Sequence, residues 1–163
     1  MPRPGSDATV TLSVFDRLLD YDPRNSREVP PTRAQAVRLL KDSVRRDLEW
    51  LLNTRSVAVP PDDKLKEVNR SLYVFGLPDF TAVSLASPAD RARIVRQLQN
   101  AVKLFEPRLG RVRIVPVEDT NTVTRTLHFR IEGLLMMDPS PEHVAFDTVM
   151  QLSTGVCEVS SAG

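Results

Sequence analysis

The chain has 163 residues, 41% of them hydrophobic and 26% charged, with a formal net charge of +1. This is the composition of an ordinary globular protein that can bury a core, and the charge carries no global signal for nucleic acid or an acidic membrane. The single cysteine, Cys157, excludes an internal disulfide and favours a reducing compartment.

The first 31 residues predict an N-terminal extension outside the core. Residues 1–10, MPRPGSDATV, lack the apolar run of a signal peptide, and no apolar stretch of the chain is long enough to span a membrane. We therefore expect a cytoplasmic protein without membrane insertion. Residues 12–20 predict one or two amphipathic helical turns, and the polar, proline-rich residues 21–31 predict a tether. Residues 32–163 then form one domain.

Three helices are predicted in the first two thirds of this domain. The first begins at Thr32, where Thr32 and Gln35 fit a capping box, and the third begins at Ser87-Pro88 and is stopped by Pro107. The helix predicted between them runs from Leu65 and is ended by Gly76. The apolar residues at helical spacing are, for the first helix, Val37, Leu40, Val44, Leu48 and Leu51; for the second, Leu65, Val68, Leu72 and Phe75; and for the third, Ile94, Leu98, Ala101, Val102 and Phe105.

After Gly110 the hydrophobic period changes from 3.6 to 2, which predicts strands. We expect them at 111–117, 122–132, 143–152 and 155–159, with a hairpin loop around 118–121. Helices followed by meandering strands indicate an α+β fold, in which a three-helix layer packs on an antiparallel sheet of about four strands and a short helical extension precedes it.

The stretch 47-DLEWLLNTR-55 raises the question of catalysis, because it places two acids beside the chain's only tryptophan. On the first helix Trp50 and Asn53 point away from the core stripe, and Glu49 lies on a flank as the i,i+4 partner of Arg45. Adjacent residues of a helix do not face each other, so the Trp50 ring does not enclose Glu49 and a catalytic acid is not predicted. Trp50 and Asn53 instead predict a second contact layer, in this chain or in a partner.

No other chemistry is indicated. The two histidines, His128 and His143, have no cysteine or histidine nearby at metal-ligand spacing, and neither a nucleophile elbow nor a glycine-rich phosphate loop is present. We expect no catalytic residue, no metal, no cofactor and no small-molecule substrate.

The corner 105-FEPRLG-110 holds an oppositely charged pair, because Pro107 restrains the backbone between Glu106 and Arg108. Such a rigid pair suits recognition of a partner's charges. An internal salt bridge that braces the corner explains it equally well, and both readings stay open.

Four motifs in register resemble TssE, the baseplate wedge subunit of bacterial type VI secretion systems, related to the contractile-phage wedge protein once labelled a lysozyme. They are 12-LSVFDRLLD-20, 48-LEWLLNTR-55, 71-SLYVFGLPDF-80 and 104-LFEPRL-109, and the resemblance extends from about residue 12 to 159. Val74-Phe75 departs from the Asn-Tyr-like pair that often precedes the glycine in the family.

The resemblance implies a structural role without enzymatic activity. Expected partners are the wedge proteins TssF and TssG, with TssK as a further candidate, and the sheath proteins TssB and TssC. The family's Glu-Pro-Arg motif falls on Glu106, Pro107 and Arg108, and with Trp50, Asn53 and Arg55 we predict these residues to contact partners. A peptidoglycan hydrolase and a free-standing strand-addition adaptor are the alternatives.

The last predicted strand, 155-GVCEV-159, lies near the chain end and carries one charge, Glu158. Protection of its edge looks thin, and an open edge suits pairing with a strand of another chain. We therefore predict partner contact at Cys157 and Val159, with a strand that simply closes the domain's own sheet as the alternative.

Overall fold

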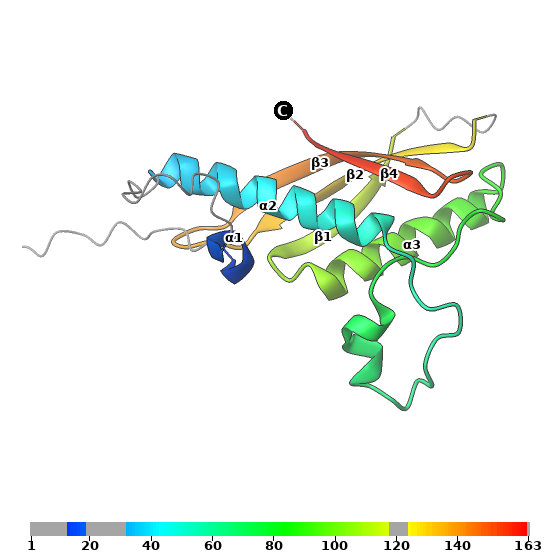
Figure 1. Cartoon of the computed structure of the whole chain (residues 1–163). Helices are drawn as coiled ribbons and strands as arrows, with labels where there is room; N and C mark the ends of the chain where they lie inside the picture. The colour runs from blue at the N-terminus through cyan, green and yellow to red at the C-terminus, as the bar shows by residue number, and fades with distance from the viewer. Residues whose placement is uncertain (1–12, 19–31, 118–123, 163) are drawn as a thin grey trace, which may run out of the picture.

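The structure is a computed structural model of the chain and describes residues 13–18, 32–117 and 124–162. Within these ranges the predicted α+β fold and four-stranded antiparallel sheet are confirmed, with two long helices on one face of the sheet (Figure 1). The strand order is the meander β1-β2-β3-β4. The elements are α1 (Val14–Leu18), α2 (Arg33–Asn53), α3 (Pro88–Phe105), β1 (Leu109–Pro116), β2 (Thr126–Leu135), β3 (Glu142–Gln151) and β4 (Val156–Ser161).

Helix α2 begins where the sequence predicts. The Thr32 backbone N–H donates to the Gln35 side chain (2.8 Å), and the Gln35 N–H donates back to the Thr32 hydroxyl (3.4 Å), which closes the capping box. The predicted stripe is buried from Leu40 to Leu51 and packs along β4. Most of the stability of such a helix comes from burying its apolar stripe against the sheet and not from local helix propensity.

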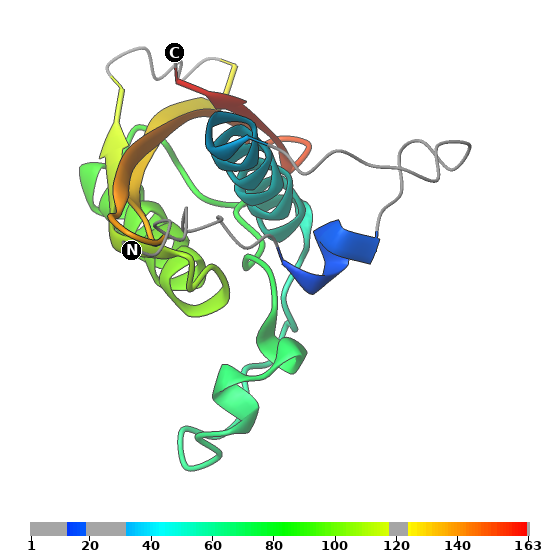
Figure 2. The same ribbon diagram turned by 90° about the vertical axis from the view of Figure 1, so that its left-hand side faces the viewer.

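Helix α3 has the predicted cap and end. The Ser87 hydroxyl accepts from the Asp90 N–H (3.3 Å), Pro88 occupies the first turn, and the helix stops at Phe105 before Pro107. Its buried residues Ile94, Leu98 and Val102 face the sheet beside β1. Figure 2 shows the sheet curved around the two helices, so that one core lies between the layers.

The sheet follows the predicted alternation. In β2 the side chains of Leu127, Phe129 and Ile131 are buried, and the residues between them are more exposed. In β1 the register with β2 shifts between Gly110 and Arg113, which places a bulge directly after the Glu106–Arg108 corner.

The helix predicted over 65–75 is wrong, so the helical layer has two members and not three. The segment instead forms two short 3-10 turns, Val68–Arg70 and Leu72–Val74, within an arm that projects from the body between α2 and α3 (Figure 1). Two residues of the predicted stripe are largely exposed, Leu65 at 51% and Leu72 at 80%, and Phe75 is the member that packs against the core.

Local side-chain bonds explain why turns replace this helix. The Asn69 amide donates to the carbonyls of Asp62 and Leu65, and the Ser71 hydroxyl donates to the Val68 carbonyl. Asparagine and serine compete in this way with helical backbone bonds, and a short helix without a buried face cannot offset that competition. The apolar residues do have helical spacing, but the fold offers a packing surface to Phe75 and leaves Leu65 and Leu72 exposed.

Three predicted features lie wholly outside the described residues: the first ten residues, the tether over 21–31 and the hairpin loop around 118–121. The first two residues of the strand predicted over 122–132 lie outside them as well. Of the amphipathic helical turns predicted over 12–20, the structure describes residues 13–18, which contain α1. Within the described ranges, no helix combines the length and apolarity that crossing a bilayer requires.

Candidate functional site

The Glu106–Arg108 corner is a closed, two-point ion pair. The Arg108 Nε donates to Glu106 Oε1 (2.7 Å) and its Nη2 donates to Oε2 (2.5 Å), while the Arg108 backbone N–H also donates to Oε1 (3.2 Å). Glu106 is only 3% exposed. A carboxylate this deeply buried requires such a partner, because charge is costly to remove from water.

Two residues of α2 complete the coordination of Arg108. Its Nη2 donates to Asp47 Oδ2 (2.6 Å), and its Nη1 donates to the Ser43 hydroxyl (3.0 Å). The guanidinium therefore connects α2 to the start of β1. Of the two readings left open by the sequence, the internal brace is present in this structure, and contact with a partner's charges stays a prediction.

Burial lowers the pKa of Arg108, but the hydrogen bonds and charges of Glu106 and then Asp47 outweigh it and hold the pKa above its ordinary value. Arg108 consequently remains charged at any physiological pH.

Helix α1 joins the same network through Asp16. The Asp16 carboxylate accepts from the Ser43 hydroxyl (2.7 Å) and from Arg46 Nη2 (2.8 Å), while Arg46 also bonds Asp47. Burial raises the pKa of Asp16, yet the bonds from Ser13, Ser43 and Arg46 lower it below its ordinary value. This contribution to α1 attachment is present above the unfolded pKa of about 3.9 and is lost as pH falls through the lowered folded value.

An apolar groove of about 430 Å³ lies beside this network. Phe75 and Phe105 meet edge to face in its wall, with ring centroids 5.1 Å apart. The other lining residues come from α1, α2 and the corner: Ser13, Phe15, Asp47, Trp50, Leu51, Glu106, Pro107 and Arg108. Two of the predicted site segments, 47–55 and 105–110, are thus brought together on one surface.

Trp50 points away from the core as predicted and is 53% exposed. The predicted second layer over it is found within the chain: the Phe15 ring meets Trp50 edge to face at 6.1 Å, and the Arg46 guanidinium lies over both rings. Contact between Trp50 and a partner remains a prediction.

Asn53 binds the edge strand of its own sheet. The Cys157 N–H donates to Asn53 Oδ1 (2.9 Å), and Asn53 Nδ2 donates to the Cys157 carbonyl (2.8 Å). The next outward-facing carbonyl, of Val159, accepts from Arg45 at 3.4 Å. The sequence therefore underestimated the protection of this edge, because the covering side chains lie more than a hundred residues earlier in the chain.

Cys157 and Val159 bury their side chains, so a partner could reach them only through the backbone. Burial, followed by the charges of Glu49 and Glu158, raises the pKa of the Cys157 thiol to about 12. The thiol is accordingly a core group and no nucleophile. Pairing of another chain with this edge stays a prediction.

We expect Asn53→Ala to lower the free energy of unfolding by about 2 kcal/mol, because it leaves both backbone groups of Cys157 without their partner. Asn100→Ala, at an exposed position of α3, is the matched control and should change it by less than about 0.5 kcal/mol. Urea denaturation of both variants measures the difference. Equal stability of the two would show that water replaces Asn53 at no cost.

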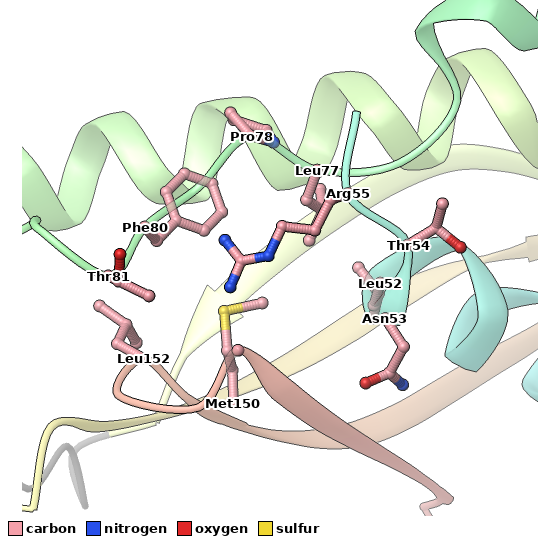
Figure 3. Close-up of a pocket in the computed structure, with 11 residues that line it drawn as sticks. Leu52, Asn53, Thr54, Arg55, Leu77, Pro78, Phe80, Thr81, Met150 and Leu152 are labelled. Atoms are coloured by element: carbon pink, nitrogen blue, oxygen red, sulfur yellow. The ribbon is translucent and has the colours of Figure 1, made fainter. Parts of the chain in front are cut away.

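Arg55 lies apart from the groove. Its guanidinium pairs with Asp79 and runs between Phe80 and Met150 along a cavity of about 20 Å³ (Figure 3). A Cβ on Gly155 would lie 2.6 Å from an Arg55 nitrogen, so the glycine leaves room for this side chain. The cavity holds about one water molecule and is too small for a ligand.

Glu49 pairs with Arg45 (3.2 Å) on the flank of α2, which confirms the predicted i,i+4 partner. Among the described residues, no group of three or more histidine, cysteine or carboxylate side chains could hold a metal ion.

Sequence reasoning missed Ser43, Arg46 and Asp16 as members of the network. Asp47 stood in the stretch that drew attention, but its partner Arg108 is 61 residues away. A clue was present at Ser43, a polar residue on the otherwise apolar face of α2, now 3% exposed.

A model of the family described as baseplate wedge protein gp25 matches residues 38–140, more than half of the chain. The chain belongs to the baseplate wedge protein gp25 family, and so to the structural proteins of phage-tail-like baseplates. Comparisons with curated proteins and with solved structures found no match.

Proposed function

We propose that this chain is a TssE-type wedge subunit of a type VI secretion baseplate. In this role it joins the wedge complex to the contractile sheath, helps to initiate sheath assembly and has no enzymatic activity. Family membership carries the proposal, and the matched range contains α2 from Arg38, the arm, α3 and the Glu106–Arg108 corner. The proposed location is the cytoplasm.

The apolar groove beside Arg108 is the proposed wedge contact. It combines an aromatic wall with a rigid charged rim. The residues that contribute most to binding energy in protein interfaces are often aromatic residues and arginine near the centre of the contact. The proposed occupants are TssF and TssG, with TssK as a further wedge partner. We assign contact with the sheath proteins TssB and TssC to the edge of β4, at backbone groups other than those that Asn53 and Arg45 bind.

Neither alternative has a specific observation in its favour. A peptidoglycan hydrolase needs two carboxylates about 5–10 Å apart across a sugar cleft, and Glu106 and Asp47 in the groove are both engaged by Arg108. A free-standing adaptor would bind a single peptide and would not enter a multi-protein wedge.

The test is co-expression of the tagged chain with TssF and TssG. We expect both proteins to co-purify with it. Trp50→Ala should weaken their binding about tenfold, because it removes an exposed aromatic side chain that lines the groove. Leu39→Ala, an exposed apolar residue of the same helix outside the groove, is the matched control and should bind normally.

Absence of both wedge proteins from the purified complex, or a turnover of peptidoglycan that disappears in Glu49→Gln, would overturn the proposal. Equal loss of binding in the two alanine variants would place the contact outside the groove.

A further inference from the structure

Helix α1 is held on α2 by one acidic and one aromatic side chain. None of its five residues is buried, and its aliphatic side chains Val14 and Leu18 are exposed. Its contacts are the Asp16 carboxylate on Ser43 and Arg46, and the Phe15 ring against Trp50 and the Arg46 guanidinium. Any short helix with an aromatic residue directly before a carboxylate could make the same contacts.

The receiving surface on α2 is formed by Ser43, Arg46 and Trp50, and we call it the Arg46 surface. The Arg46 guanidinium lies 5.2 Å from the Phe15 ring centroid and 5.1 Å from the Trp50 ring centroid, while it donates to Asp16. A guanidinium recognises an aromatic face and a carboxylate at the same time, which an ammonium group does less well.

We propose that the Arg46 surface is a binding site for a short helical segment of a partner protein that carries an aromatic residue followed directly by a carboxylate, and that α1 occupies this site until the partner displaces it. The seated Phe15-Asp16 pair shows which chemistry the surface accepts.

The surface remains in place when α1 leaves. Asp47 holds Arg46 by two bonds (3.0 and 2.9 Å), and Arg108 donates to Ser43 (3.0 Å), so both polar groups keep a second partner. Displacing α1 removes no side chain from the core, because none of the residues of α1 is buried. A partner segment therefore exchanges one carboxylate for another on a preformed site, which limits the ordering cost of binding.

This inference rests on the proposed function in one respect: the partner is taken to be another protein of the baseplate. Its test contains no baseplate protein, so failure here leaves the co-purification result of the wedge proteins untouched.

The first measurement uses Trp50, the chain's only tryptophan, in the full-length protein. Asp16→Asn removes the charge that binds Arg46 and should release α1 from α2. Trp50 then loses its contact with the Phe15 ring, so we expect acrylamide quenching of Trp50 emission to rise by about half. Arg17→Gln, an exposed charge on the same helix, is the matched control and should leave the quenching unchanged.

The second measurement is fluorescence anisotropy of a labelled peptide with the sequence of residues 11–20, TLSVFDRLLD. We expect it to bind the Asp16→Asn protein about tenfold more tightly than the wild type, because the internal competitor is weakened. Peptides with Phe15→Ala or Asp16→Asn should lose at least about tenfold in affinity for that variant.

The proposal would be overturned if the peptide bound wild type and Asp16→Asn protein with equal affinity. It would also be overturned if the Phe15→Ala and Asp16→Asn peptides bound as tightly as the unchanged peptide. A concentration-dependent dimer of the Asp16→Asn protein would also overturn it, since the occupant would then be α1 of a second copy. Unchanged Trp50 quenching in Asp16→Asn would show that the charge does not hold α1.

Discussion

Arg108→Ala is expected to lower the free energy of unfolding by roughly 3 kcal/mol, because it leaves Glu106 buried without its charged partner. The same change removes the hydrogen bonds to Asp47 and Ser43 that connect α2 to the corner. Thermal or urea denaturation measures the loss. Lys103→Ala, an exposed cation in the last turn of α3, is the control and should cost less than about 0.5 kcal/mol.

Two further variants separate charge from geometry. Arg108→Lys keeps the charge but offers one compact ammonium group in place of the planar fork, so it should recover only part of the stability. Adding Glu106→Gln to Arg108→Ala should recover some as well, since a buried neutral amide costs less than a buried unpaired carboxylate. A melting temperature of Arg108→Ala equal to the wild type would show that solvent replaces the guanidinium and that Arg108 is available to a partner.

Gly76→Ala is the second change with a large expected effect. Gly76 has φ +108°, and a Cβ there would lie 2.4 Å from the Thr54 carbonyl oxygen and 2.8 Å from its carbon. The backbone bonds at this place, from the Leu77 N–H to Thr54 (2.8 Å) and from the Ser56 N–H to Leu77 (2.9 Å), close the base of the arm. We expect a loss of roughly 3 kcal/mol from backbone strain and the clash together.

Gly110→Ala is the control for this prediction. The closest atom to its Cβ would be Sδ of the flexible Met136 side chain, at 3.1 Å, and the backbone carbonyl oxygen of Leu134 would lie at an ordinary contact distance of 3.7 Å. The expected cost is below about 1 kcal/mol, again by urea denaturation. If Gly76→Ala cost no more free energy of unfolding than Gly110→Ala, the base of the arm would adjust to a Cβ, and the turn there would not require glycine.

The polar network connects the groove with α1. Ser43 bonds both Asp16 and Arg108, and Asp47 bonds both Arg46 and Arg108, so the polar side chains form a closed ring under α1 and beside the groove. A partner that removed Asp16 from this ring would change the surroundings of Arg108 as well. The Arg108 brace and the proposed docking groove therefore share one hydrogen-bond network.

The sequence by itself determined the two long helices, their N-terminal caps and the meander sheet, because these depend on local patterns; the strand bounds differ from the predicted ones by up to four residues. The capping box at Thr32, the cap at Ser87 and the alternation of Leu127, Phe129 and Ile131 are each read over a few residues, and each is found in the structure. The flank position of Glu49 and the outward direction of Trp50 follow from helical geometry alone.

Only the tertiary structure decided the rest, because it depends on contacts between distant segments. A helix over residues 65–75 would require a surface that buries its whole apolar stripe, and the fold packs Phe75 against the core but leaves Leu65 and Leu72 exposed. The partners of Arg108, Asn53 and Asp16 lie 61, 104 and 30 residues away along the chain, at Asp47, Cys157 and Arg46. A hydrogen bond between two such residues leaves no periodic trace in the sequence, so the closed network and the covered β4 edge appear only when the layers pack.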